Sequence, residues 1–180
     1  NNLFLEETDS ALPRIRKIRN ISEMDKEAGV VVRPGDLVVL DIDDTLLKSK
    51  AGQILNLDPK VLDMVNNWQA LNARELEPTK HIRIIILTAR FSENGAKKDL
   101  KEIGFPDAIE VICAPHESET KPTKGNALRN RLDAEKIMPK RIIVIDDLEE
   151  NLIDVHTTLQ EHGVYKGIPL KLLQKEAGIK

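Results

Sequence analysis

The stretch Val38-Val39-Leu40-Asp41-Ile42-Asp43-Asp44-Thr45-Leu46-Leu47 is the most informative part of this 180-residue chain. An apolar run is followed by three carboxylates within four positions, and the sequence then becomes apolar again. Several carboxylates at the end of a buried strand are costly unless a positive charge lies among them. A magnesium ion beside a phosphate would meet that need, because hard divalent cations take oxygen ligands.

The size and charge of the chain limit the classes of function. One domain spanning residues 1–180 is expected for this length. The chain has 30 acidic and 27 basic residues, a net charge of −3, so we expect no general attraction to nucleic acid. No apolar stretch approaches the roughly 20 residues that span a bilayer, so a soluble protein without a membrane span is expected.

The compartment stays open at this point. The chain begins with Asn1 rather than Met, and no signal peptide is recognisable. The protein is therefore expected to be either cytoplasmic, or secreted or periplasmic after removal of a targeting segment.

Apolar runs alternate with amphipathic segments over most of the chain. Uninterrupted apolar strands indicate a sheet buried on both faces, and their alternation with helices indicates parallel pairing. We predict an α/β fold, a three-layer sandwich with a central parallel sheet and a Rossmann-type core. The predicted strands are 37–42, 81–87, 109–114, 141–145 and an edge strand at 164–170, and the predicted helices are 22–28, 59–74, 92–103, 123–135, 149–162 and a helical tail.

Polar residues follow each of four predicted strands. Ligands of open α/β sheets bind beyond the carboxyl ends of the strands, so these residues are expected to meet. Any one of them has a structural explanation as a helix cap, a turn residue or a solvated charge, but the ordered set does not. In chain order the clusters are Asp41, Asp43, Asp44 and Thr45; Thr88 and Arg90; Lys121 and Lys124; and Asp146 and Asp147.

These residue types suit phosphoryl transfer, which depends on positioning and on neutralisation of charge. An aspartate can act as the nucleophile and form an aspartyl-phosphate, and a second carboxylate can protonate the leaving oxygen and later activate water. Magnesium can bridge carboxylate and phosphate oxygens, while a hydroxyl and a lysine bind the remaining phosphate charge.

The same residues resemble the haloacid dehalogenase (HAD) superfamily of aspartyl-phosphate enzymes. Its pattern is Asp-x-Asp-x-Thr, then a strand ending in Thr or Ser, then Lys, then an acidic pair, and the resemblance covers about residues 36–170. It implies a HAD-like fold and a phosphatase that uses Mg²⁺. The implied roles are Asp41 as nucleophile, Asp43 as general acid/base, Thr88 and Lys124 as phosphate-binding residues, Thr45 and Asp147 as supporting residues, and Asp41, Asp43 and Asp146 as metal ligands, with Asp43 acting through its main-chain carbonyl.

Two assignments within this set have alternatives. Lys121 competes with Lys124 for the role of the site lysine, and Lys124 is favoured because it opens a predicted helix, as the family lysine usually does. Asp146 and Asp147 could exchange roles, since they are adjacent and both follow the fourth strand.

Other residues near the motifs receive secondary roles. The resemblance implies that Thr45 orients Asp43, whereas Asp44 is expected to be a structural residue of the turn. Arg90 would either contact a second charge on the substrate or form a surface salt bridge. His116, among acidic residues, is expected to lie in a solvated loop.

The segments around the motifs are short. Residues 1–35 are expected to form an N-terminal extension with a short helix, and 48–80 a small, mainly helical insert where HAD enzymes can carry a large cap. Such a minimal cap leaves an open site, which suits a phosphoprotein, or a small phosphorylated molecule if an oligomer partner covers the site. The flanks also resemble a poorly characterised bacterial HAD-like group that includes secreted members from intracellular bacteria.

The predicted function is a Mg²⁺-dependent phosphatase that acts through an aspartyl-phosphate intermediate, with no substrate assigned. One alternative is a HAD-like binding or effector module with little catalysis. Another is a phospho-accepting signalling domain, in which the acidic pair usually comes early in the chain and the acceptor lies on a middle strand. The order of the clusters in this sequence is different.

Overall fold

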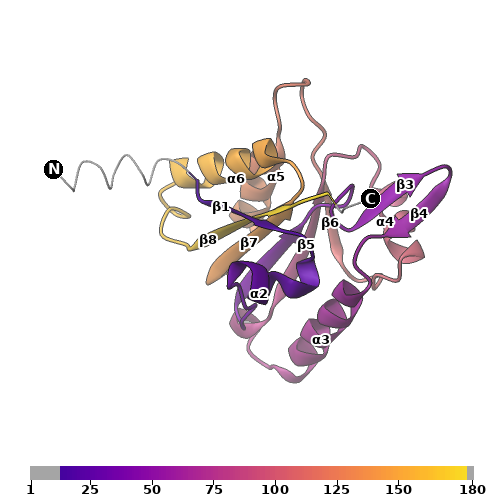
Figure 1. Ribbon diagram of the computed structural model, residues 1–180. Helices are drawn as coiled ribbons and strands as arrows, with labels where there is room; N and C mark the ends of the chain where they lie inside the picture. Colours follow the sequence, from indigo (N-terminus) through magenta and orange to yellow (C-terminus); the bar gives the residue numbers. More distant parts are fainter. Residues whose placement is uncertain (1–12, 178–180) are drawn as a thin grey trace.

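A parallel sheet forms the centre of the computed structural model, which describes residues 13–177. Its six strands are β1 (Ile15–Ile18), β2 (Asp36–Leu40), β5 (Arg83–Thr88), β6 (Glu110–Cys113), β7 (Arg141–Asp146) and β8 (Leu170–Lys175). Their spatial order is β1-β8-β7-β2-β5-β6, and every neighbouring pair is parallel (Figure 1). The predicted α/β fold with a central parallel sheet is therefore confirmed.

Helices cover both faces of this sheet (Figure 1). One face carries α2 (Met24–Ala28), α3 (Lys60–Arg74) and α4 (Glu93–Glu102), and the other carries α5 (Lys124–Ala134) and α6 (Glu149–Glu161). Short 3₁₀ helices, η1 (Ile21–Glu23) and η2 (Pro78–Lys80), precede α2 and β5. Within residues 13–177, no helix combines the length and the apolar character needed to cross a membrane.

Strand β2 shows why the central strands β2, β5 and β7 contain uninterrupted apolar runs. Val38 and Leu40 pack with α2, α3 and α4, whereas Leu37 and Val39 pack with α5 and α6. Each of these four side chains is at most 1% exposed. Because both faces are covered by helices, no position of the strand can be polar without losing contact with water. Since β2 pairs with both β5 and β7, the carboxyl ends of these three strands lie side by side.

The predicted elements near the C-terminus are wrong. Instead of an edge strand at 164–170 and a helical tail, residues 170–175 form strand β8, which lies between β7 and β1 inside the sheet. Leu, Lys and Gln favour helices in isolation, but pairing with the free edge of β7 outweighs that preference. Residues 178–180 of the predicted tail lie outside the described residues.

The N-terminal extension and the insert also contain strands that the sequence does not predict. Strand β1 adds to the edge of the sheet beside β8, while residues 1–12 lie outside the described range. The insert begins with an antiparallel hairpin of β3 (Leu47–Lys50) and β4 (Gln53–Asn56), and α3 follows it. In the hairpin turn, Ala51 and Gly52 have φ angles of 53° and 77°. Positive values at both positions suit a tight hairpin turn.

Gly125 determines how closely α5 and α6 pack. Its main-chain N–H donates a hydrogen bond of 2.7 Å to the carboxylate of Asp154. A Cβ atom at this position would lie 2.6 Å from the main-chain oxygen of Asp154 and would also clash with the side chain of Thr158. The contact matters for the site because the preceding residue, Lys124, is one of the predicted phosphate-binding residues.

We predict that Gly125→Ala lowers the free energy of unfolding by about 2–3 kcal/mol, as expected for an overpacked position. Gly163→Ala is the control, because a Cβ atom added there meets no atom within 4 Å. Equilibrium unfolding in urea would compare both variants with the wild type. Equal stability of the two variants would contradict the importance of this contact.

Candidate active site

Side chains from three strand ends and one helix start meet at the carboxyl edge of the sheet. Asp41 follows β2, Thr88 ends β5, Asp146 ends β7, and Lys124 is the first residue of α5. All four are buried, with Asp41 the most exposed at 7%. The structure joins three of these residues, Asp41, Lys124 and Asp146, by direct hydrogen bonds, and Thr88 lies at the end of the strand next to β2.

Lys124 lies between two carboxylates. Its Nζ atom donates hydrogen bonds to Oδ1 of Asp41 at 2.8 Å and to Oδ2 of Asp146 at 2.6 Å. Burial by itself would lower the pKa of Lys124, but the negative charges of Asp41 and Asp146 outweigh it, so the pKa is raised. The ammonium group therefore stays charged and neutralises part of the acidic cluster.

The carboxylates in this cluster outnumber the cations. Asp41, Asp146 and Asp147 each offer an oxygen atom, and these atoms lie within 4.8 Å of one another. Burial, together with the charge of Asp41, raises the pKa of Asp146, against the opposing effect of Lys124. Burial and the neighbouring carboxylates of Asp41 and Asp146 raise the pKa of Asp147 to about 8. A group of hard oxygen donors that is short of positive charge fits a divalent cation.

The turn after β2 orients the first of these carboxylates. The hydroxyl of Thr45 donates a hydrogen bond of 2.8 Å to Oδ2 of Asp41. The sequence predicted that Thr45 orients Asp43. The structure shows a hydrogen bond from Thr45 to Asp41 instead, because the tight turn brings the hydroxyl back over Asp41. Asp44 occupies the left-handed region with a φ of 61°, and its N–H donates to the carbonyl of Leu47 at 2.8 Å. Asp44 is thus a turn residue, as predicted.

Asp43 points to a different cation. Arg90 donates from Nε to Oδ2 of Asp43 at 2.9 Å and from Nη2 to Oδ1 at 2.8 Å. The same guanidinium donates from Nη1 to Asp99 on α4 at 2.6 Å. The sequence left two roles open for Arg90, contact with a second substrate charge or a surface salt bridge. The structure shows a salt bridge, and its partner Asp43 is a predicted catalytic residue.

Two residues beside Asp146 were not recognised as part of the site. The side-chain amide of Asn151, in the first part of α6, donates to both carboxylate oxygens of Asp146 at 3.3 Å. The side-chain oxygen of Asn151 lies 3.3 Å from Nε2 of His116. His116 is therefore half-buried against Asn151 rather than in a solvated loop. The sequence signal for Asn151 is a polar residue at helical spacing with the apolar residues Leu152, Val155 and Leu159.

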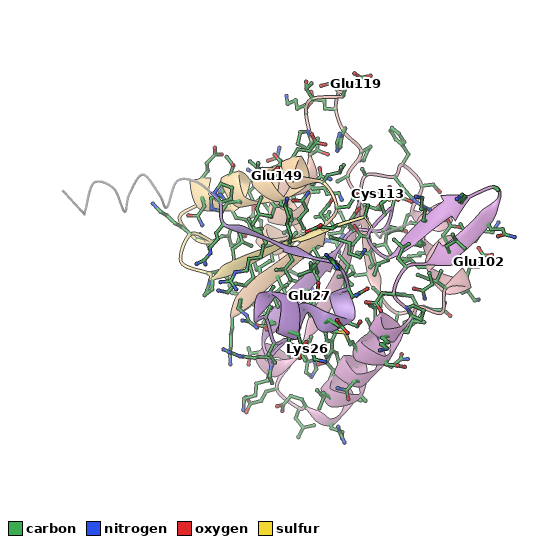
Figure 2. All side chains as sticks on the ribbon, in the orientation of Figure 1. Lys26, Glu27, Glu102, Cys113, Glu119 and Glu149 are labelled. Atoms are coloured by element: carbon green, nitrogen blue, oxygen red, sulfur yellow. The ribbon has the colours of Figure 1, made fainter. Side chains whose placement is uncertain are left out.

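Lys121 does not reach the cluster. Its side chain is 65% exposed and pairs with Glu117, with 3.1 Å between Nζ and Oε2. Both residues lie in a loop that projects from the body of the protein, and Figure 2 labels Glu119 at its tip. Lys124, by contrast, is 1% exposed and contacts two site carboxylates.

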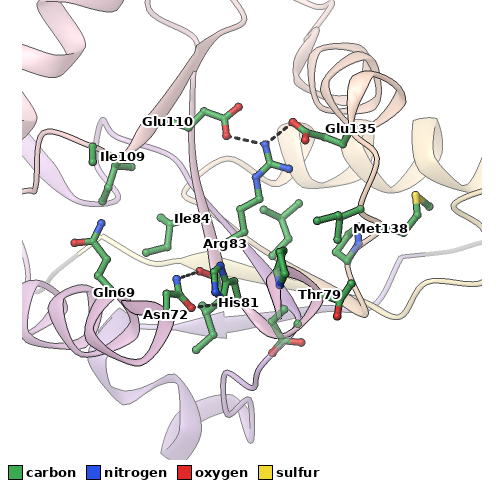
Figure 3. Close-up of a pocket in the computed structure, with 18 residues that line it drawn as sticks. Gln69, Asn72, Thr79, His81, Arg83, Ile84, Ile109, Glu110, Glu135 and Met138 are labelled. Carbon is green, nitrogen blue, oxygen red and sulfur yellow. Dashed lines mark hydrogen bonds and ion pairs between the residues drawn. The ribbon is translucent and has the colours of Figure 1, made fainter. Parts of the chain in front are cut away.

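A separate cavity of about 380 Å³ lies at the opposite edge of the sheet, where β2, β5 and β6 begin. Figure 3 shows Arg83 between Glu110 and Glu135, with 2.7 Å between nitrogen and oxygen in both pairs. None of the site residues predicted from the sequence lines this cavity. The chemistry at the carboxyl edge is therefore independent of it.

Two solved structures similar to this chain are of the HAD domain of the effector protein Lem4 from Legionella pneumophila, and one of them is an inactive mutant. The TM-scores are 0.51 and 0.50, with 15% and 14% sequence identity. The matches cover 82% and 81% of this chain and 89% and 88% of those domains. This likeness shows a HAD-like fold.

Comparison of sequences adds one family. The model of DUF2608, a family of proteins of unknown function, matches residues 119–174, a range that includes Lys124 and Asp146. No curated protein matches the chain. The similarity to these solved structures extends to the fold.

We predict that the affinity for Mg²⁺ rises with pH up to about 8 and then levels off, because Asp147, with its raised pKa, has to lose a proton when a cation binds. Titration calorimetry in two buffers of different ionisation enthalpy would measure the affinity and the proton release. Asp147→Asn should remove most of the pH dependence. A wild-type affinity that does not change with pH would contradict the prediction.

We also predict that Lys124→Met destabilises the fold by about 3–5 kcal/mol, because it leaves buried carboxylates without their cation. Lys121→Met is the matched control, since the side chain of Lys121 is exposed and its single ion pair is with Glu117. Urea unfolding of both variants at neutral pH would measure the difference. Equal stability of the two variants would show that the buried pairs contribute nothing.

Proposed function

We propose that this protein is a magnesium-dependent phosphohydrolase that forms an aspartyl-phosphate on Asp41. The environment of the Asp41 carboxylate carries the proposal. One oxygen accepts a hydrogen bond from Lys124 and the other from Thr45, both at 2.8 Å. These contacts fix the carboxylate at the end of β2, and each oxygen keeps a free lone pair with which it could attack phosphorus.

In the first step, an oxygen of Asp41 would bond to phosphorus while the bond to the leaving oxygen breaks. Asp43 would give its proton to that leaving oxygen. Thr88 would bind the phosphate: its Oγ accepts a hydrogen bond of 3.1 Å from the N–H of Arg90, so its own proton is free to be donated. Lys124 would balance the charge of the nucleophile and the phosphate.

In the second step, water would attack the phosphorus of the aspartyl-phosphate, and Asp43 would take the proton from that water. The bond between phosphorus and Asp41 breaks, which releases inorganic phosphate and restores the carboxylate. The same carboxyl group of Asp43 thus acts first as an acid and then as a base.

Magnesium would be held by the carboxylates of Asp41 and Asp146 and the main-chain carbonyl of Asp43, with Asp147 in support. Bound there, it would supply charge neutralisation for the phosphate. The crowded oxygen atoms of the acidic cluster support this assignment, since they lie within 4.8 Å of one another and Lys124 contacts two of the three carboxylates.

The proposed substrate is a phosphorylated small molecule or a phosphoprotein. The insert consists of the β3–β4 hairpin and α3, which supports an accessible site. The side chain of Asp43 is 48% exposed, so a leaving group attached to a large molecule could reach it. A second copy of the chain covering this opening would favour a small substrate instead.

A binding or effector module with little catalysis is the second candidate, because the two solved structures described above come from an effector protein. Beryllium fluoride, which mimics a phosphoryl group on an aspartate, separates the two candidates. For the phosphatase, we expect a rise in Tm that requires Mg²⁺ and Asp41. No such rise would favour the binding module.

We predict that Asp41→Asn lowers the rate of phosphate release from p-nitrophenyl phosphate by at least about a thousandfold, since the amide is a poor nucleophile. Asp44→Asn is the matched control: Asn tolerates the left-handed backbone found there, and this variant should keep most of the activity. Phosphate release would be measured with Mg²⁺ present. Activity of Asp41→Asn at the wild-type level would refute the role of Asp41.

A further inference from the structure

Arg90, in the loop between β5 and α4, lies between two carboxylates from different parts of the chain. Its guanidinium makes two hydrogen bonds with Asp43, at 2.8 and 2.9 Å, and one with Asp99 of α4, at 2.6 Å. The Arg90 side chain is 20% exposed, whereas that of Asp43 is 48% exposed. The arginine is therefore the more enclosed member of the pair and can serve as its fixed part.

The orientation of the Asp43 carboxylate depends on this contact. Within residues 13–177, the side-chain hydrogen bonds to the Asp43 carboxylate all come from Arg90. A planar guanidinium that donates two parallel hydrogen bonds fixes both the position and the plane of a carboxylate. A general acid/base must lie within hydrogen-bond reach of the proton it transfers, so the orientation of Asp43 bears directly on its proposed role.

Asp99 holds the other side of the guanidinium. All three guanidinium nitrogen atoms of Arg90 donate to carboxylates of the protein, and Asp99 is part of a helix whose Ala96 and Leu100 are buried in the core. The hydrogen bond with Asp43 raises the pKa of Arg90, against the opposing effect of burial, so the group stays charged. This arrangement differs from an isolated surface pair, which would hold neither partner firmly.

The main chain of Arg90 also contacts the proposed phosphate-binding residue. Its N–H donates to Oγ of Thr88 at 3.1 Å, which leaves the hydroxyl proton of Thr88 available for another acceptor. One residue thus orients both Thr88, through its main chain, and Asp43, through its side chain.

We propose that Arg90 is a positioning residue for proton transfer: its guanidinium fixes the position and plane of the Asp43 carboxyl group, which in the proposed reaction gives a proton to the leaving oxygen and then takes one from water. This inference rests on the proposed function of the site. Asp99 serves as the anchor of Arg90. The Arg90 side chain acts on the reaction through Asp43 and does not itself bind the substrate phosphate.

The test compares two aryl phosphates with different leaving groups in the presence of Mg²⁺. Phenolate needs protonation as it leaves, whereas the more acidic p-nitrophenol leaves readily without it. For Arg90→Gln we expect kcat/KM to fall about 10–100-fold with phenyl phosphate and less than about threefold with p-nitrophenyl phosphate, because only the first reaction depends on the general acid. Asp99→Asn, which leaves Arg90 in place, should show a smaller loss with the same selectivity.

Arg90→Lys separates charge from orientation, since lysine keeps the charge but cannot make the bidentate contact. It should lose activity with the selectivity of Arg90→Gln. Lys97→Gln is the control for substitution of a cation on α4, because Lys97 forms only an exposed pair with Glu93. It should behave as wild type with both esters. Thermal unfolding would show that each variant is folded, and Asp99→Asn provides the test if Arg90→Gln is not.

Three outcomes would overturn the inference. An equal loss with both esters, accompanied by a higher KM, would mean that Arg90 binds the phosphate. Wild-type activity of Arg90→Gln with both esters would mean that the Arg90–Asp43 contact is only a surface salt bridge. Full activity of Arg90→Lys would mean that the positive charge, and not the bidentate contact, is what the reaction needs. Failure of the proposed function is distinguished by Asp41→Asn: if this variant retains activity, or the wild type hydrolyses neither ester, the nucleophile assignment fails before Arg90 is considered.

Discussion

The buried ammonium of Lys124 between Asp41 and Asp146 is the interaction on which the candidate site depends. Two adjacent parallel strands end in carboxylates at nearly the same place, and their mutual repulsion would be severe in a buried position without a cation. The ammonium comes from the first residue of α5, whose position is fixed by the close contact of Gly125 with α6. The packing of α5 against α6 therefore also determines where the positive charge of the site lies.

The positive charge of Lys124 does not neutralise all the carboxylates of the site. Lys124 contacts two carboxylates, and Asp147 adds a third that has its pKa raised to about 8. A phosphate group brought to this edge would add further negative charge. Among residues 13–177, the cations paired with the predicted catalytic aspartates are Lys124 and Arg90, and Arg90 is already shared by Asp43 and Asp99. A divalent metal is the simplest source of the missing charge, and the oxygen donors present suit it.

The predictable parts of the fold are those whose structure follows from the residues of one short segment. Uninterrupted apolar runs identify β2, β5 and β7, and the polar residues that follow these strands identify most of the site. Strands β1 and β8 could not be predicted, because β1 is only four residues long, β8 is rich in helix-favouring Leu, Lys and Gln, and both form strands by pairing with a neighbouring edge of the sheet. The contacts of Asn151 with Asp146, and of Arg90 with Asp43, join segments that no short motif connects.

Asp41 and Asp43 are two positions apart, yet the fold gives them opposite surroundings. Asp41 is buried and held by Lys124 and Thr45, whereas Asp43 is half-exposed and held by Arg90. Two carboxylates with different environments can take different roles, one as nucleophile and the other as acid and base. The acidic cluster lies toward β7, and Asp43 faces the side of α4 and the β3–β4 hairpin, which contact each other through Asn56 and Ile103. In the proposed reaction the leaving group would lie on that side, next to the hairpin and the loop after β5.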